Sequence, residues 1–282
     1  MTSSTLLSII TFVYGLSAFI YIFSWVFKKP EVARLATWTA AIGFIGHAAG
    51  IIWRWNESYG LGIGHAPLSN LYESLIFFAF SLTLIYLIIE YKYRNQIIGA
   101  FIMPLAFLTM AYASLSPSVS NHIQPLIPAL KSNWLIAHVI ACFIGYSAFA
   151  VAFGLSLMYL IKQREVDPPA GGSGWLELFP GKQALDELTH QMVMFGFIFL
   201  TAGIITGAVW ANSAWGRYWG WDPKETWSLI TWLVYAALLH ARVRWDWRGK
   251  RSAYLSVLGF AAVMVTYFFV NYLPGLHSYG SS

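Results

Sequence analysis

Eight apolar runs constrain the fold of this chain more than any other sequence feature. Each run is about long enough to cross a lipid bilayer as a helix. A transmembrane helix needs roughly 20 consecutive apolar residues, and charged or Pro/Gly-rich segments separate runs of that length along the chain. We therefore predict an all-α integral membrane protein with about eight transmembrane helices. The predicted helices cover residues 4–27, 35–55, 70–91, 97–115, 133–161, 187–211, 224–243 and 253–273.

Composition agrees with a chain that lies in lipid. Hydrophobic residues make up 58% of the sequence and charged residues only 10%, whereas about one quarter of the residues in soluble domains are charged. We expect a multi-pass protein of the inner or cytoplasmic membrane, with the lipid bilayer around it. Residues 1–282 are predicted to form a single polytopic membrane domain, in which residues 162–186 are a cytoplasmic linker.

Lysine and arginine residues predict the orientation of the helices, because cytoplasmic loops carry an excess of them. One set of alternate loops carries 13 such residues, and the opposite set carries four. Both termini are therefore predicted to lie on the outer, periplasmic or extracytoplasmic side. The net charge of +5 is explained by the lysine and arginine residues of the predicted cytoplasmic loops. It gives no reason to expect nucleic acid as a partner. The outer set consists of Arg54, Lys131, Arg217 and Lys224.

A tryptophan-rich segment is predicted on the outer side, between the sixth and seventh helices. Residues 215–227 read WGRYWGWDPKETW and hold four of the 14 tryptophans. Tryptophans gather at membrane interfaces in general, which is one explanation for the cluster. Against it, we expect Trp215, Trp219 and Trp221 in an irregular, glycine-containing stretch, whereas interfacial aromatic residues usually lie singly at helix ends. Residues 212–227 are called the tryptophan segment below.

The end of the tryptophan segment has the sequence of a helix start. We expect Asp222 to be the N-cap, Pro223 the first helical residue and Glu225 the carboxylate of a capping box. This cap would begin the seventh helix and would also hold the tryptophan segment in place.

The tryptophans, cationic side chains and histidines predicted on the outer side favour haem as a ligand. A suitable ligand is flat and largely apolar, carries anionic groups at one edge, and has a metal that accepts imidazole nitrogen. Tryptophan rings can stack on a porphyrin, and their N–H groups can bond to propionates. Arg217 and Lys224 could pair with the propionate charges. Outer histidines His138 and His277 could supply two axial ligands.

The single cysteine excludes several kinds of redox site. Cys142 falls inside the fifth predicted helix, where we expect a small buried side chain. One cysteine forms no internal disulfide, no Cys-x-x-Cys motif and no Cys-x-x-Cys-His haem attachment site. Thiol-reducing proteins are therefore possible partners, because this chain does not carry the thiols itself.

Three separated stretches resemble a known family. WGRYWGWDPKETWSLITWLVYAALLHAR resembles the tryptophan-rich signature, called the WWD domain, of cytochrome c assembly proteins that handle haem. SNWLIAHVIACFIGYSAFA and the terminal VNYLPGLHSYG narrow the resemblance to the CcsA/ResC family, the membrane subunit of the system II cytochrome c synthase. The resemblance extends from about Gly64 to Gly280.

The resemblance implies haem ligands at two depths. His138 and His277 match two external histidines that ligate haem iron beside the signature. His240, in LLHAR, matches a membrane-embedded histidine whose haem takes its second ligand from a CcsB/ResB-type membrane subunit. His47 and His190 are weaker ligand candidates, for which ordinary packing is the alternative. The remaining two, His65 and His122, are expected to be ordinary loop histidines.

The resemblance also implies how an outer haem would be held. Four tryptophans would form its platform, namely Trp215, Trp219, Trp221 and Trp227. Five residues would support them, namely Gly216, Gly220, Asp222, Arg217 and Lys224. The haem iron would be the only metal, held by His138, His277 and His240.

The function that the resemblance implies is cytochrome c biogenesis. Haem b would be carried from the cytoplasmic side to the outer site and presented to the Cys-x-x-Cys-His segment of apocytochrome c for thioether attachment. No catalytic residue is assigned beyond haem positioning, so the chain is expected to act as one subunit of a holocytochrome c synthase. The alternatives are a haem exporter or binding module without synthase chemistry, and a di-haem membrane electron-transfer protein.

Overall fold

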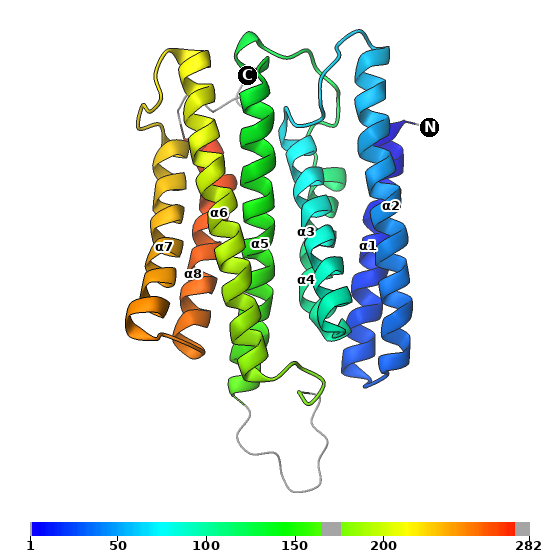
Figure 1. The fold of residues 1–282 in the computed structure, drawn as a ribbon. Helices are drawn as coiled ribbons and strands as arrows, with labels where there is room; N and C mark the ends of the chain where they lie inside the picture. The colour runs from blue at the N-terminus through cyan, green and yellow to red at the C-terminus, as the bar shows by residue number, and fades with distance from the viewer. Residues whose placement is uncertain (1, 165–175, 274–282) are drawn as a thin grey trace, which may run out of the picture. The chain divides into compact units, whose positions relative to one another are not determined.

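The computed structural model describes residues 2–164 and 176–273, and α-helices make up most of that part of the chain (Figure 1). The predicted all-α class is confirmed. The helices are α1 (Ser3–Val26), α2 (Pro30–Gly60), α3 (Leu71–Tyr93), α4 (Gly99–Leu115), α5 (Asn133–Gln163), α6 (Lys182–Trp215), α7 (Pro223–Trp245) and α8 (Lys250–Tyr267), with the short 3-10 helices η1 (Gln96–Ile98), η2 (Pro128–Leu130) and η3 (Phe269–Tyr272).

Six of these helices, α1 to α6, are long and apolar enough to cross a membrane, judged by length and composition. The other two, α7 and α8, have 23 and 18 residues and more polar sequences. The chain is thus a multi-pass membrane protein, as predicted. The outer location of both termini and the inner location of the 162–186 linker stay predictions, and His277 lies outside the described residues.

The described residues divide into two compact units. Unit 1 consists of α1 to α4 together with residues 176–180, and unit 2 consists of η2 and α5 to α8. Each unit has its own buried apolar core, in which the apolar faces of its helices pack against one another.

Close helix packing in unit 1 depends on glycines of α2. A Cβ atom at Gly43 would lie 2.8 Å from a ring carbon of Tyr14, and one at Gly50 would lie 2.7 Å from a methyl carbon of Leu7. Small residues let membrane helices approach closely and gain van der Waals contact. These glycines therefore bring α2 against α1.

One buried carboxylate in unit 1 is surrounded by hydroxyl groups. Glu90 accepts a hydrogen bond of 2.7 Å from the Tyr21 hydroxyl at Oε2, a second bond to the same oxygen from Tyr86, and a 2.5 Å bond from Thr37 at Oε1. Buried polar groups are costly unless they find such partners. These bonds link α3 to α1 and α2.

Unit 2 is built around the antiparallel pair of α5 and α6, which lie side by side in Figure 1. Gly145 and Gly196 face each other across this pair, because a Cβ atom on either would lie 3.0 Å from the carbonyl oxygen of the other. One turn further along α5, the rings of Phe149 and Tyr235 stack with centroids 3.6 Å apart, which anchors α7. Close packing of α5 and α6 is what places the candidate site.

Several helices extend further than predicted, and α2 and α6 extend the most. The α6 helix continues to Trp215 and ends at Gly216, which adopts the left-handed conformation with φ of 73°. Trp215 is therefore helical, and its expected place in an irregular stretch is wrong. The α2 helix continues from residue 55 to Gly60, and Arg54 near its end is buried in an ion pair with Glu73.

Candidate functional site

His138 lies in the second turn of α5, half-buried, with its ring turned toward α6. Its Nδ1 atom lies 2.7 Å from the carbonyl oxygen of Gly203. A carbonyl oxygen only accepts hydrogen bonds, so Nδ1 carries the proton and Nε2 carries the lone pair. Histidines that bind metals usually donate their other N–H group in this way. The backbone of α6 thus fixes the orientation of the His138 ring.

Two glycines of α6 provide the space for this arrangement. A Cβ atom at Gly207 would lie 2.6 Å from Nδ1 of His138, and one at Gly203 would lie 2.5 Å from Sγ of Cys142. Cys142 is buried, as predicted, with its sulfur 3.6 Å from Nδ1 of His138. Substitution at either glycine would therefore displace the histidine ring or the cysteine beside it.

Trp210 belongs to the site but was not among the predicted residues. Its ring lies nearly parallel to the His138 ring, with centroids 6.1 Å apart and an interplanar angle of 16°. Its Nε1–H group donates a 2.8 Å hydrogen bond to the carbonyl oxygen of Ala129, and its ring contacts Trp215. The spacing of Gly203, Gly207 and Trp210 places them on one face of α6. This spacing is the sequence pattern from which Trp210 could have been predicted as part of the site.

The tryptophan segment has an unusual backbone between α6 and α7. The rings of Trp219 and Trp221 meet edge to face, with centroids 5.8 Å apart. Trp221 has a φ of 57° and is 70% exposed. A bulky residue with positive φ is rare, and such backbone strain concentrates at functional sites. In the first turn of α7, the carbonyl oxygen of Trp227 accepts a hydrogen bond from Thr266 of α8.

The predicted capping box is confirmed and does more than begin α7. Asp222 is buried and accepts a 2.9 Å hydrogen bond from the backbone N–H of Lys224. The carboxylate of Glu225 accepts backbone hydrogen bonds from Asp222 and from Gly220, at 3.2 and 2.7 Å. One side chain therefore ties two backbone positions of the tryptophan segment to the helix start.

Two cationic side chains lie beside the tryptophans. The guanidinium group of Arg217 covers Gly220, where a Cβ atom would lie 2.6 Å from Nε and Cζ. Lys224 is half-buried and lies close enough to Asp222 and Cys142 to interact electrostatically with both. Positive charge is thus present on both flanks of the segment.

His240 lies at the opposite end of α7 and is exposed on the surface of unit 2. Its ring contacts the ring of Trp245, with centroids 5.5 Å apart and nearly perpendicular planes. Lys224 and His240 are 16 positions apart, which corresponds to about 24 Å along a helix. The structure therefore does not bring His240 to His138.

An ion-pair cluster fixes the end of α7 to α6 near His190. Arg242 is buried and pairs with Asp186 at 2.8 Å and Glu187 at 3.2 Å. Asp186 also accepts a 2.7 Å hydrogen bond from the backbone N–H of Gly249. The Nδ1 atom of His190 is buried without a hydrogen-bond partner among the described residues.

His47 lies in unit 1, away from the residues that unit 2 brings together. It is fully buried, its Nδ1 atom lies 3.1 Å from the Tyr14 hydroxyl, and its ring packs against the ring of Phe80. Its Nε2 atom has no hydrogen-bond partner among the described residues. Tight packing by aromatic rings is the environment of a core histidine.

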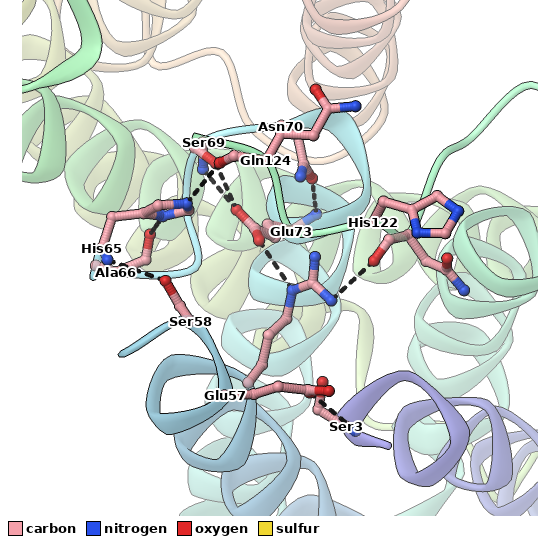
Figure 2. A network of polar contacts seen from close by, with 12 residues as sticks. Ser3, Glu57, Ser58, His65, Ala66, Ser69, Asn70, Glu73, His122 and Gln124 are labelled. Carbon is pink, nitrogen blue, oxygen red and sulfur yellow. Dashed lines mark hydrogen bonds and ion pairs between the residues drawn. The ribbon is translucent and has the colours of Figure 1, made fainter. Parts of the chain in front are cut away.

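The two loop histidines differ in their surroundings. His122 is exposed, as expected for an ordinary loop residue. His65 is 7% exposed and belongs to a polar network that also contains Glu73 (Figure 2). This network was not predicted from the sequence.

The chain resembles proteins of cytochrome c assembly. A family model described as "Cytochrome C assembly protein" matches residues 68–277. "Cytochrome c biogenesis protein CcsA" of Guillardia theta is 45% identical over 243 residues, which are 80% of this chain and 79% of the relative. The protein of the same name from Synechococcus sp. (strain CC9605) is 40% identical over 279 residues, covering 91% and 90% of the two chains.

A solved structure has a similar fold. "Cytochrome c Heme Lyase CcmF" superposes with a TM-score of 0.73 at 18% sequence identity, and the match covers 95% of this chain. This chain spans about half of that one, 47% of its length. At this identity the likeness concerns the fold alone.

Proposed function

Because this chain belongs to the cytochrome c assembly protein family, with CcsA proteins as its relatives, we propose that it binds haem and presents it for covalent attachment to apocytochrome c. Its role in cytochrome c biogenesis follows from the family. The name of the structural neighbour, a haem lyase, supports haem as the substrate. The form handled would be haem b, since covalent attachment is the step that the family serves.

The hydrogen bond from His138 to Gly203 is the observation that carries this proposal. Iron in a porphyrin already has four ring nitrogens, so a protein supplies only the axial ligands. His138 can supply one through Nε2. His277 is proposed for the other position from its place in the family motif, and it lies outside the described residues.

The tryptophan segment would position the porphyrin. Trp221 presents an exposed ring, and aromatic rings stack on flat apolar ligands. Arg217 and Lys224 offer charges for the propionates. The four proposed platform residues are Trp215, Trp219, Trp221 and Trp227, and the backbone that carries them is shaped by Gly216, Gly220 and the Asp222 cap.

The chain's part in the reaction is to hold and orient the reactants. Haem supplies two vinyl groups, and the two thiols of a Cys-x-x-Cys-His segment add across them to form thioether bonds. Fixed geometry lowers such barriers by roughly 7–11 kcal/mol in favourable cases. The described residues accordingly serve to bind, orient and release haem, and we assign none of them a proton-transfer step.

A second haem position is proposed at His240, nearer the cytoplasmic side. Because this side chain is exposed on unit 2, a histidine of a CcsB/ResB-type subunit could approach the other face of the iron. Polar side chains in lipid mark pathways or internal bonds, and a metal bond would offset the cost. His190 and His47 remain weaker candidates.

The role of Trp210 can be measured through haem affinity. Trp210→Leu removes both the ring beside His138 and the hydrogen bond to Ala129, so haem affinity of the purified chain should fall roughly tenfold. Trp210→Phe keeps a ring and should lose less. Absorbance titration with haem gives the dissociation constants, with Trp38→Leu, an exposed position of unit 1, as the matched control. Equal affinities for both leucine variants would rule out this role.

Reconstitution with a reporter tests the proposed function as a whole. The chain is co-expressed with a CcsB/ResB-type subunit and a Cys-x-x-Cys-His reporter, or with a Ser-x-x-Ser-His version of it. We expect covalent haem on the cysteine reporter only when chain and subunit are both present, and haem retained by the complex with the serine reporter. If haem supplied on the outer side becomes attached to the reporter in the absence of this chain, the chain would be a haem exporter without synthase chemistry. Two stable haems that cycle electrons without attachment would favour the electron-transfer protein.

A further inference from the structure

His65 joins two loops of unit 1. The first loop, residues 61–70, connects α2 to α3, and the second, residues 116–127, follows α4. The backbone N–H of His65 donates a 3.0 Å hydrogen bond to the hydroxyl of Ser58, at the end of α2. The residue is therefore held in place by its own backbone, while its ring reaches the second loop (Figure 2).

Both ring nitrogens of His65 face carbonyl oxygens. Nδ1 lies 2.9 Å from the oxygen of Ala66, and Nε2 lies 3.1 Å from the oxygen of Gln124. A carbonyl oxygen only accepts hydrogen bonds, and a neutral imidazole has a single N–H group. Both bonds therefore form together only when the ring carries two protons. In the neutral ring, one nitrogen lone pair faces an oxygen lone pair.

Charged groups around the ring link the same two loops independently of His65. Arg54 and Glu73 form a buried ion pair of 2.8 Å. Glu73 also accepts hydrogen bonds from the N–H and hydroxyl of Ser69 in the first loop, and Arg54 donates one to the carbonyl oxygen of Asn121 in the second.

The other titratable groups nearby are Glu57, which accepts a hydrogen bond from the backbone of Ser3, and the exposed His122. Since the charges of Arg54 and Glu73 compensate each other, the bonds that this pair makes to the two loops do not depend on the protonation of the His65 ring.

We propose that His65 is a proton-dependent clasp between residues 61–70 and residues 116–127. The clasp is closed when the imidazole is doubly protonated and loosens when the ring loses one of its two protons, because one of the two hydrogen bonds is then lost. On the orientation predicted from the loop charges, both loops face the outer compartment, so the clasp would respond to the pH there. This inference does not depend on the binding of haem.

Hydrogen–deuterium exchange of the full chain in lipid nanodiscs tests the clasp. Exchange of peptides from both loops is measured at about pH 5.5 and about pH 8, on either side of the histidine range, and corrected for the intrinsic effect of pH on amide exchange. We expect both loops to open roughly fivefold less often at the lower pH, the factor expected for one hydrogen bond. Imidazole nitrogen NMR of histidine-labelled chain should show a doubly protonated His65 ring at the lower pH and a singly protonated ring at the higher pH, with His65→Gln identifying the signal.

Two variants decide between the clasp and a purely structural role. His65→Gln has an amide that donates at any pH, so its loops should lose the pH dependence and keep part of the protection. His122→Gln, in the second loop, should behave like the wild type. Loop exchange that is independent of pH in the wild type, or a pH dependence that persists in His65→Gln, would overturn the proposal.

Discussion

Replacing His138 with alanine is expected to abolish covalent attachment of haem to a Cys-x-x-Cys-His reporter while the chain still accumulates in the membrane. The substitution removes the side chain that we propose as an axial ligand and that the Gly203 carbonyl orients. Loss of an outer-shell partner of a metal ligand costs 10–100-fold in affinity or activity, so loss of the ligand itself should cost roughly 100-fold or more. A haem stain of the reporter after denaturing electrophoresis measures attachment, and the absorption spectrum of the purified complex reports the ligands.

Added imidazole separates a lost ligand from a damaged fold. It can occupy the space of the missing side chain and should restore attachment in His138→Ala, and likewise in His277→Ala. His122→Ala, at an exposed loop position, is the matched control and should attach haem normally. Undiminished attachment in the double variant of His138 and His277 would mean that the outer ligands are misassigned. The tryptophan cluster would then be explained by the general enrichment of tryptophan at membrane interfaces.

Replacing Arg54 with alanine should destabilise unit 1 more than any surface substitution. The side chains of Arg54 and Glu73 are 3% and 1% exposed, and removal of one partner leaves an uncompensated buried charge. Such changes cost about 3–5 kcal/mol, which corresponds to a fall in the unfolding temperature on the order of 10 °C. Thermal unfolding of the purified chain in detergent measures the effect.

Removing both charges provides the internal control. Arg54→Met combined with Glu73→Met leaves no unpaired charge, and apolar replacements of buried pairs are often tolerated. We expect the double variant to recover about half of the lost stability, because Ser69 still loses its acceptor. Arg248→Ala breaks the exposed pair with Asp246 and should change little. A double variant no more stable than Arg54→Ala would show that the ion pair is not the cause.

The helices could be predicted because their cause is local. A run of about 20 apolar residues crosses lipid whatever its neighbours are, and Asp222 and Glu225 cap α7 through bonds to backbone a few residues away. The errors concern the ends of helices. The α2 helix continues past its predicted end at residue 55, and α6 includes Trp215 and ends at the left-handed Gly216.

The candidate site was predictable only in part. His138 and the four tryptophans belong to recognisable motifs, and the structure describes all five. Trp210 was missed, because its contact with His138 joins residues 72 positions apart through the packing of α5 on α6. The same packing places the Gly203 carbonyl, and no pattern in either helix alone indicates that hydrogen bond.

The sequence by itself determined the helical membrane class, the long helices of the described residues, the helix start at Asp222 and the residue types that we propose for haem. Hydrophobic length and helix capping depend on neighbouring residues in the chain, so they can be inferred without a structure. Only the tertiary structure decided that α5 packs with α6 to α8 in one unit, which ring nitrogen of His138 carries its lone pair, and that both nitrogens of His65 face carbonyl oxygens. These features depend on contacts between atoms that are distant in sequence, and such contacts form only when the helices pack.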